Sequence, residues 1–224
     1  MKNIVIIPVR GGSKRFPEKN IQQLGEFPLL VHSIQYAKNN TAIVDEIYVS
    51  TDDMKIKEMA LQYGAKVIDR PESLSGDFEP TVSALKHVLE SIETTFENVI
   101  LLQATNPLRP ENLLKEAFEV FKNGNYNSLF TVSRNHQKLG KISENKFHPF
   151  NYTIGQRSQD LDPLFFENGL LYITKASLIL DNIIISENGY PFEVNHIFAN
   201  VDIDTQDDLE YAQYLFNKFI IHNS

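Results

Sequence analysis

The sequence predicts an α/β fold in which a doubly wound, mostly parallel β-sheet lies between two layers of helices. Two observations lead to this prediction. Strand and helix patterns alternate four times up to residue 121, and each unit has the length of a βαβ crossover. The strand patterns are continuous apolar runs, which is typical of parallel strands buried on both faces. With 224 residues, the chain is expected to form one compact domain, residues 1–224.

The first unit starts with residues 4–9, a β-branched apolar run that is closed by the glycine pair Gly11 and Gly12. Its helix is expected at residues 28–39. The proline at position 28 falls near the first turn, where a missing N–H is tolerated. Residues 46–50 are the next apolar run and are expected to form the second strand.

The second helix is expected to follow at once, because Asp52 or Asp53 can serve as its N-cap. Apolar residues at helical spacing mark its core face, namely Ile56, Met59, Ala60 and Tyr63. Gly64 stands where a C′ glycine would end this helix. Residues 66–69 are expected to form the third strand.

The third and fourth helices are marked by the same spacing of apolar residues. The marker residues of the third helix are Leu85, Val88, Leu89 and Ile92. A buried strand is expected at residues 98–103, and Pro110 is expected at position N1 of the fourth helix. The core face of that helix consists of Leu114, Ala117, Phe118 and Phe121.

The alternation ends after a strand expected at residues 128–133. Residues 134–165 are polar and aromatic without a period, and they are too long for an ordinary connection. They are therefore expected to form a lid, an arm to a partner or a small excursion of the sheet. Strands are expected again at residues 170–174 and 197–203, and a final helix starts at Thr205 with a capping-box-like acid three residues later.

The composition argues against several classes of protein. The absence of cysteine excludes disulfides, thiolate metal sites and cysteine nucleophiles. A formal net charge of −8 argues against a protein that binds duplex nucleic acid. No apolar run approaches the roughly 18 residues of a membrane helix, and the first residues lack the pattern of a signal peptide. We therefore expect a soluble, cytoplasmic protein that binds neither nucleic acid nor a membrane.

Residues 10–20 contain four of the 21 basic residues of this acidic chain. They follow the first buried strand, and ligands in open α/β sheets bind beyond the carboxyl ends of strands. Glycines can turn backbone N–H groups toward oxyanions, and lysine and arginine side chains can neutralise them. A solvated basic turn is the alternative. The loop matches neither the Walker A nor the dinucleotide pattern, so we expect a nucleotide triphosphate site of another kind.

Two further clusters lie near the ends of predicted strands. Asp202 and Asp204 are two residues apart, so both carboxylates are expected on one side of the strand, where they suit a Mg²⁺ ion that bridges a phosphate. Capping of the next helix is the alternative explanation for this acid pair. Gln103 could hydrogen-bond a substrate from a strand tip, and Arg109 could hold a carboxylate or pair with a surface acid.

Several segments, in this order along the chain, resemble motifs of the acylneuraminate cytidylyltransferases, the CMP-sialic acid synthetase family. Residues 10–20 resemble the signature R-x-x-S-K-x-x-x-x-K-N, and residues 103–109 resemble Q-P-T-S-P-L-R with Ala104 and Asn106 as departures. Residues 168–173 resemble the strand N-G-A-I-Y-I. The remaining similar positions are residues 49–52, residues 70–71 and residues 202–205, the last reading D-I-D-T.

The resemblance implies a nucleotide-diphospho-sugar transferase-like fold of three layers. It also implies a Mg²⁺-dependent reaction in which CTP and a nonulosonic acid, a nine-carbon 2-keto sugar acid, give CMP-nonulosonate and pyrophosphate. A homodimer is implied, in which residues 134–165 serve as a dimerisation segment or lid that reaches the partner's site.

By position, the resemblance also implies roles for individual residues. The catalytic residues would be Arg10, Lys19 and Asp204, and Asp202 and Asp204 would bind the metal. The nucleotide-binding residues would be Arg10, Gly11, Ser13, Lys14, Lys19, Asn20, Arg70, Asp77 and Thr81. The residues that bind the sugar would be Gln103, Arg157, Gln159 and Asn168.

Residues 165–169 depart from the family, because they read F-F-E-N-G where sialic acid enzymes often read F-R-P-N-G. The missing arginine and the new acid, Glu167, alter the sugar side, so legionaminic, pseudaminic or another nine-carbon acid can replace N-acetylneuraminic acid as the expected substrate. Two other functions remain open. One is a cytidylyltransferase for an eight-carbon Kdo-like acid, and the other is a nucleotide-binding regulatory domain without activity.

Overall fold

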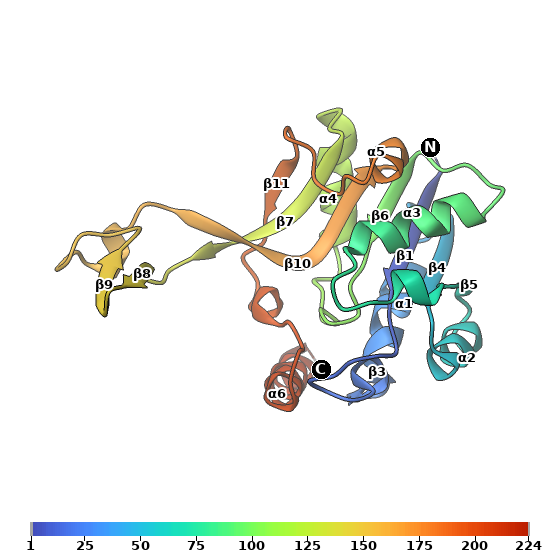
Figure 1. Cartoon of the computed structure of the whole chain (residues 1–224), viewed down its shortest axis with the longest axis horizontal. Helices are drawn as coiled ribbons and strands as arrows, with labels where there is room; N and C mark the ends of the chain where they lie inside the picture. Colours follow the sequence, from blue (N-terminus) through green and yellow to red (C-terminus); the bar gives the residue numbers. More distant parts are fainter. Residues whose placement is uncertain (1, 224) are drawn as a thin grey trace.

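The computed structural model describes residues 2–223, and side chains as far as residue 219. Its main feature is a seven-stranded sheet with the order β11-β7-β10-β6-β1-β4-β5 (Figure 1). Among the described strands of this sheet only β10 runs antiparallel to its neighbours, which confirms the predicted, mostly parallel arrangement. The strands are β1 (Asn3–Pro8), β4 (Glu46–Thr51), β5 (Lys66–Asp69), β6 (Asn98–Leu101), β7 (Ser128–Asn135), β10 (Leu164–Lys175) and β11 (Tyr190–Glu193).

Helices cover both faces of the sheet, as predicted. Helices α1, α2 and α4 pack on one face, and α3 and α5 pack on the other. Their bounds are α1 (Leu29–Lys38), α2 (Met54–Gln62), α3 (Thr81–Ser91), α4 (Leu113–Asn123) and α5 (Ala176–Leu180). The long helix α6 (Gln206–Asn223) lies beyond the carboxyl ends of the parallel strands, where it packs on the small β2–β3 hairpin (Gln23–Leu24 and Phe27–Pro28).

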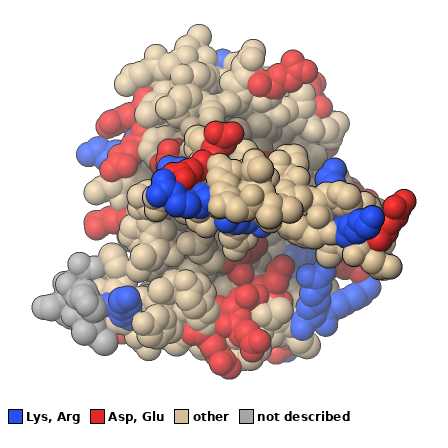
Figure 2. All heavy atoms as spheres, turned by 90° about the vertical axis from the view of Figure 1, so that its left-hand side faces the viewer, with Lys and Arg blue, Asp and Glu red and all other residues tan. Residues whose placement is uncertain are grey.

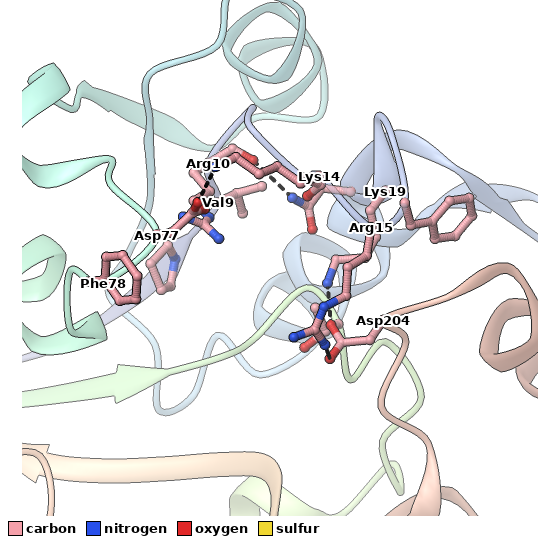
Figure 3. A pocket seen from close by; sticks show the side chains of 13 residues that line it. Val9, Arg10, Lys14, Arg15, Lys19, Asp77, Phe78 and Asp204 are labelled. Atoms are coloured by element: carbon pink, nitrogen blue, oxygen red, sulfur yellow. Dashed lines mark hydrogen bonds and ion pairs between the residues drawn. The ribbon is translucent and has the colours of Figure 1, made fainter.

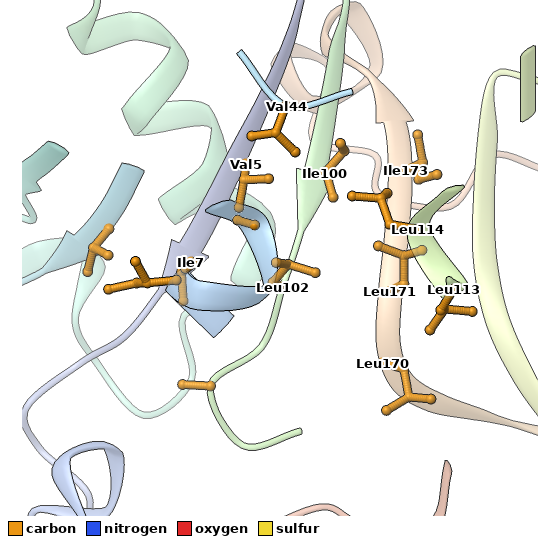
Figure 4. Close-up of a cluster of buried hydrophobic side chains, with 14 of the residues drawn as sticks. Val5, Ile7, Val44, Ile100, Leu102, Leu113, Leu114, Leu170, Leu171 and Ile173 are labelled. Atoms are coloured by element: carbon orange, nitrogen blue, oxygen red, sulfur yellow. The ribbon is translucent and has the colours of Figure 1, made fainter. Parts of the chain in front are cut away.

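Strand β1 shows how the two layers of core form. Its side chains alternate, so that Val5 and Ile7 face α1, α2 and α4 while Ile4 and Ile6 face α3 and α5. All four are completely buried. Figure 4 shows the first of these layers, where residues of β1, β6 and β10 meet side chains of α4. Each fully buried side chain of this size contributes roughly 1.5–3 kcal/mol by leaving water, which explains why the strands are continuous apolar runs.

Several predicted helix ends are confirmed. Asp53 is the N-cap of α2, and its carboxylate accepts a hydrogen bond of 3.0 Å from the N–H of Ile56. Gly64 follows the end of α2 with φ of +83°, the left-handed conformation that favours glycine. Asp208 accepts hydrogen bonds from the N–H and the hydroxyl of Thr205, both 2.8 Å long, so α6 begins with the expected capping box.

The predicted start of one helix and one predicted strand are wrong. Helix α4 begins at Leu113, because residues 110–112 form a turn in which the N–H of Leu113 donates to the carbonyl of Pro110. Residues 197–203 are not a strand but a short 3-10 helix, η4 (Ile197–Asn200), followed by an extended segment outside the sheet. The apolar residues of this region are buried against α6 and β2, so their pattern reflects packing beside the sheet and not within it.

Residues 134–165, called the arm from here on, protrude from the body (Figure 1). The outer parts of β7 and β10 remain paired as they leave the body, with Asn135 opposite Leu164. Beyond them lies a separate hairpin of β8 (Gly140–Ser143) and β9 (Lys146–Pro149), followed by the 3-10 turn η3 (Ser158–Asp160). Of the shapes that the sequence left open, the structure shows an excursion built on extended strands of the main sheet. Among the described helices, none is long and apolar enough to cross a membrane.

Candidate active site

A cavity of about 540 Å³ opens beyond the carboxyl end of β1. This cavity is called the loop pocket from here on, because residues 10–20, the basic loop, form much of its wall. Its lining residues are Pro8, Val9, Arg10, Ser13, Lys14, Arg15, Phe16, Lys19, Asn20, Asp77, Phe78, Thr105 and Asp204. Segments that are far apart in sequence therefore meet here, at the edge of the sheet where the sequence predicted a ligand.

The basic loop is tied at both ends. The side-chain amide of Asn20, which is buried, donates a 3.2 Å hydrogen bond to the carbonyl of Arg10. The N–H of Gly11 donates to the carboxylate of Asp52 at 2.9 Å, so this group is not turned toward a phosphate as we had expected. Gly11 is needed for another reason: a Cβ atom at this position would lie 2.7 Å from Asp53, the N-cap of α2.

Two carboxylates hold the cations of the basic loop on opposite sides of the pocket (Figure 3). On one side, Asp77 pairs with Arg10 at 2.8 Å and with Lys14 at 2.5 Å. The hydrogen bond from Lys14 and the charge of Arg10 hold the pKa of Asp77 below its usual value. Asp77 therefore carries a full negative charge at neutral pH in a place that is rich in cations.

On the other side, Asp204 pairs with Lys19 at 2.6 Å and lies 4.0 Å from Arg15. The side chain of Lys19 is mostly enclosed, with 13% exposure, whereas that of Arg15 is 83% exposed. Lys19 is thus held in one place, whereas the guanidinium of Arg15 is surrounded by solvent.

Asp202 lies next to Asp204, although neither residue is in a strand. The extended segment buries Val201 and Ile203 and exposes the two acids between and after them, so both carboxylates do lie on one side. Packing around its carboxylate raises the pKa of Asp202, and the charge of Asp204 adds to this rise, while a hydrogen bond from Thr105 opposes it. A cation bound between the two carboxylates would stabilise their charged forms.

A metal ion would fit this pair only with help from a ligand. No group of three or more histidine, aspartate or glutamate side chains within metal-binding range exists among the described residues. Mg²⁺, however, is commonly held by one or two carboxylates together with substrate phosphates and water. The carboxylates of Asp202 and Asp204 and the hydroxyl of Thr105 offer oxygen ligands for that mode, and Lys19, which pairs with Asp204, would have to give up this carboxylate to the ion.

A second hollow, of about 250 Å³, adjoins the loop pocket and shares Pro8, Arg10 and Asp77 with it. Arg70 and Thr81, two predicted nucleotide-binding residues, line this hollow. The guanidinium of Arg70 is anchored, because it donates to the carbonyl of Ser50 at 2.6 Å and to its hydroxyl at 3.1 Å. Burial lowers the pKa of Arg70, but the group remains charged at neutral pH.

Arg109 has neither of the two roles that the sequence suggested. It is 7% exposed, and it donates to the carbonyls of Leu170 and Gln103 and to the hydroxyl of Ser33, at 2.7 to 3.0 Å. Burial lowers its pKa to about 10, and no carboxylate pairs with it in the described part of the chain. Arg109 therefore joins the loop after β6 to β10 and α1, which is a structural role.

The predicted sugar-binding residues are in different surroundings. Gln103 is half-buried at the carboxyl end of β6, and its side chain forms no hydrogen bond with a described residue. Asn168, in contrast, is buried, and its side chain bonds internally to Thr131, Ser133 and the N–H of Leu170. This enclosed position speaks against direct contact between the side chain of Asn168 and a ligand.

Arg157 and Gln159 lie in the arm and do not line the loop pocket. The guanidinium of Arg157 forms two hydrogen bonds to the carboxylate of Asp160, at 2.7 and 3.0 Å. Within one chain the structure therefore does not bring these two residues to the cations.

Sequence reasoning gave no individual role to six residues that line the loop pocket, namely Pro8, Val9, Arg15, Phe16, Phe78 and Thr105. Phe78 is fully exposed beside Asp77, and Thr105 follows the tip of β6. Phe78 and Thr105 both belong to segments that the sequence indicated as part of the site. A single aromatic ring or hydroxyl in a loop, however, does not by itself indicate ligand binding.

A sequence profile of a protein family described as "Cytidylyltransferase" matches residues 4–223 of this chain. A pseudaminic acid cytidylyltransferase of Campylobacter jejuni is 36% identical over 228 residues, which cover 96% of this chain and 97% of that protein. A CMP-N,N'-diacetyllegionaminic acid synthase of Legionella pneumophila is 32% identical, with 96% of both chains covered. An N-acylneuraminate cytidylyltransferase of Streptococcus agalactiae is also 32% identical, but this chain spans 55% of its length.

Solved structures show the same fold at lower sequence identity. The structure of a CMP:2-keto-3-deoxy-manno-octonic acid synthetase complexed with CTP matches with a TM-score of 0.74, at 18% identity, over 97% of this chain and 99% of that one. A 4-diphosphocytidyl-2C-methyl-D-erythritol synthase matches with a TM-score of 0.70, at 15% identity, over 96% and 98% of the two chains. These matches confirm the predicted three-layer α/β architecture.

Proposed function

This chain belongs to the cytidylyltransferase family, and from that premise we propose that it transfers the CMP group of CTP to a nonulosonic acid and releases pyrophosphate. The observation that carries the proposal is the convergence of four basic side chains and an acid pair at one edge of the sheet. The relatives that are at least 32% identical over nearly the whole chain are named for pseudaminic, legionaminic and N-acylneuraminic acids, which supports this class of sugar.

Within this class we propose pseudaminic acid as the first candidate substrate. Two pseudaminic acid cytidylyltransferases of Campylobacter jejuni, 36% and 34% identical, match this chain over 97% of their own length. The segment around Glu167 also departs from the pattern of many sialic acid enzymes. The Kdo-like alternative has weaker support, because the solved structure with that name is 18% identical and shares the fold only.

The reaction requires little covalent chemistry from the protein. A hydroxyl oxygen of the sugar attacks the α-phosphorus of CTP and its proton passes to solvent, so that a new P–O bond forms while the P–O bond to pyrophosphate breaks. Arg10, Lys14 and Lys19 would hold the triphosphate and neutralise the charge that moves to the leaving pyrophosphate. Arg70 and Thr81 would border the rest of the nucleotide in the adjoining hollow, and Gln103 would offer its free amide to the sugar.

Asp202 and Asp204 would hold Mg²⁺ together with phosphate oxygens. When bound, such an ion stabilises charge on the phosphates and lowers the pKa of an attacking hydroxyl. Lys19, which pairs with Asp204, lies where it can exchange this carboxylate for a phosphate oxygen.

We also propose that two copies of the chain form a homodimer through the arm. Large apolar side chains of the arm are exposed, among them Ile142 at 79%, Phe150 at 67% and Ile154 at 80%. The arm faces the viewer in Figure 2, where uncharged atoms cover its middle part between charged groups at both ends. A partner would cover these side chains and would receive Arg157 and Gln159 near its own site.

The test is pyrophosphate release from CTP and Mg²⁺ with pseudaminic, legionaminic, N-acetylneuraminic and Kdo acids in parallel. The proposal predicts turnover with at least one nine-carbon acid and the highest kcat/KM with pseudaminic acid. Turnover with Kdo alone would establish the eight-carbon alternative. Binding of CTP without turnover of any sugar acid would favour a regulatory nucleotide-binding protein.

A further inference from the structure

Asn106 lies at the point where three segments of the candidate site meet. It follows Thr105 in the loop after β6, and it is 1% exposed. The first segment is this loop, the second is β10 at the irregularity between Glu167 and Tyr172, and the third is the extended segment that carries Asp202 and Asp204.

The side-chain amide of Asn106 joins the other two segments to its own. Its Nδ2 donates to the carbonyl of Val201 at 2.8 Å and to the carbonyl of Asn168 at 3.2 Å. Its Oδ1 lies 3.3 Å from the hydroxyl of Thr105. Both N–H groups therefore have an acceptor, on two backbone segments that are otherwise distant in sequence.

The space around Asn106 is closely matched to its shape. Gly169 has φ of +74°, and a Cβ atom at this position would lie 2.6 Å from Oδ1 of Asn106. A larger residue at position 169 would therefore push the amide away from its two carbonyls. The two hydrogen bonds and the close approach of Gly169 together hold the amide of Asn106 in place.

Two backbone groups of the segment with the two acids, one donor and one acceptor, attach it to the loop after β6 by hydrogen bonds. This segment does not belong to the sheet, and the first attachment is the N–H of Ile203, which donates to the backbone carbonyl of Thr105 at 2.8 Å. The hydrogen bond from Asn106 to Val201 is the second attachment to this loop. These two bonds lie on either side of Asp202, so they determine where its carboxylate stands relative to Thr105.

We propose that Asn106 is a positioning residue that sets the distance of the Asp202–Asp204 carboxylate pair from the loop after β6, and thereby the affinity of the site for its divalent cation. The proposal rests on the proposed function. Substitution of residues that hold metal ligands in place commonly changes metal affinity about ten- to a hundredfold, although these residues do not touch the ion.

The test compares Asn106→Ser with Asn98→Ser. A serine at position 106 is too short to reach both carbonyls, whereas its small size creates no clash. Asn98 is a matched control, because it is also buried and amide-bonded, through Asn3 at 2.8 Å, but it lies at the amino end of β6, away from the site. Both variants lose a buried hydrogen bond, so both are expected to melt at a lower temperature.

The measurement that separates them is a Mg²⁺ titration of the melting temperature with CTP present and no sugar acid, so that no turnover occurs. Asn106→Ser should need about tenfold more Mg²⁺ for half of the metal-dependent increase in Tm, and Asn98→Ser should need the same amount as the wild type. A Mg²⁺ titration of the initial rate should show the same rise in midpoint, with most of the rate recovered at saturating Mg²⁺.

A second pair of variants covers the case in which Asn106→Ser does not fold. Gly169→Ala displaces the amide without removing it and should raise the Mg²⁺ midpoint, whereas Gly64→Ala, with φ of +83° and no contact with the site, should not. An unchanged midpoint in Asn106→Ser or Gly169→Ala, or an equal rise in the controls, would overturn the inference. A wild type that shows no metal-dependent stabilisation and no turnover would overturn the proposed function instead.

Discussion

Asp77 forms ion pairs with Arg10 and Lys14, the two cations that the sequence assigns to nucleotide binding. The distances of 2.8 and 2.5 Å are those of formed ion pairs, and a triphosphate must break them to reach the same cations. In the free protein Asp77 therefore competes with the nucleotide for these two cations. It can do so because it lies on the border between the loop pocket and the adjoining hollow.

This competition predicts that Asp77→Asn binds CTP more tightly than the wild type. Because ion pairs at exposed positions contribute about 0–1 kcal/mol, the dissociation constant should fall by about two- to fivefold. Isothermal titration calorimetry with CTP, and with inorganic tripolyphosphate as a probe that has no base, measures the effect. Weaker binding of CTP together with unchanged binding of tripolyphosphate would show that Asp77 contacts the nucleoside instead.

Lys19→Ala should reduce kcat/KM for CTP by about ten- to a hundredfold, because a charge-assisted contact with a phosphate contributes roughly 1.5–3 kcal/mol. Lys66→Ala is the matched control. Lys66 also pairs with an acid, Glu46 at 2.8 Å, but it lies at the amino end of β5. Steady-state kinetics and thermal melts of both variants decide the matter. Equal losses of activity in the two variants would show that Lys19 does not contact the nucleotide.

At the residue scale, the sequence indicates the chemistry of a side chain better than its direction. The basic loop and the acid pair were predicted because charges of one sign are concentrated over a few positions. Arg109 was misjudged, since nothing in the sequence shows that its guanidinium points inward to the carbonyl of Leu170, 61 positions away. The role of Asn106 depends in the same way on contacts with residues 62 and 95 positions distant, which no local pattern contains.

At the scale of elements, His32 links α1 to the β2–β3 hairpin and to α6. Its Nε2 lies 2.7 Å from the carbonyl of Leu24, and its ring packs edge-on against Phe27 and Phe216. Burial lowers the pKa of His32 below its ordinary value of 6.5. Protonation of this ring would place a charge among the aromatic side chains that join α1, the β2–β3 hairpin and α6.

The wild type should therefore lose stability on acidification between pH 7.5 and 5.5 by more than His32→Gln does. Below pH 6.5 the unfolded chain binds a proton at this position before the folded chain does, so stability falls as the pH decreases toward the lower, folded pKa. Thermal melts at the two pH values measure the difference. His148→Gln, a change at an exposed position of the arm, should behave as the wild type, and an identical loss in all three proteins would refute the prediction.

Elements with a strong period were predicted correctly, and elements defined by their neighbours were not. The helical spacing from Ile56 to Tyr63 reflects one buried face, so it was enough to place α2. The extended segment around Ile203 has the same alternation as a strand, because buried and exposed residues also alternate in any extended chain that lies on a core. Whether a partner strand exists is a property of the tertiary structure.

At the scale of the whole molecule, the arm provides the clearest test of the proposed homodimer. Ile142 of β8 lies opposite Phe147 of β9, and both side chains are at least half exposed. If this face joins two copies of the chain, the double variant Ile142→Glu, Phe150→Glu should be a monomer in size-exclusion chromatography with light scattering, at a concentration where the wild type is a dimer.

Leu61→Glu is the control for this experiment, because Leu61 is 52% exposed on α2, outside the arm. It should remain a dimer. A wild type that is monomeric at every concentration tested would contradict the proposed dimer. A double variant that remains dimeric would place the interface elsewhere.

The ion pairs between Asp77 and the basic loop determine how the affinity for CTP depends on the salt concentration. When CTP replaces Asp77 on Arg10 and Lys14, one set of ion pairs is exchanged for another, and few small anions are released from the protein. The affinity of the wild type for CTP should therefore change little between 50 and 500 mM KCl, because added salt weakens the ion pairs with Asp77 and those with CTP alike. In Asp77→Asn the same cations are neutralised by chloride, which CTP must displace, so its affinity should fall more steeply with salt. Parallel slopes of log Kd against log [KCl] for the two proteins would show that Asp77 leaves the cations before the nucleotide arrives.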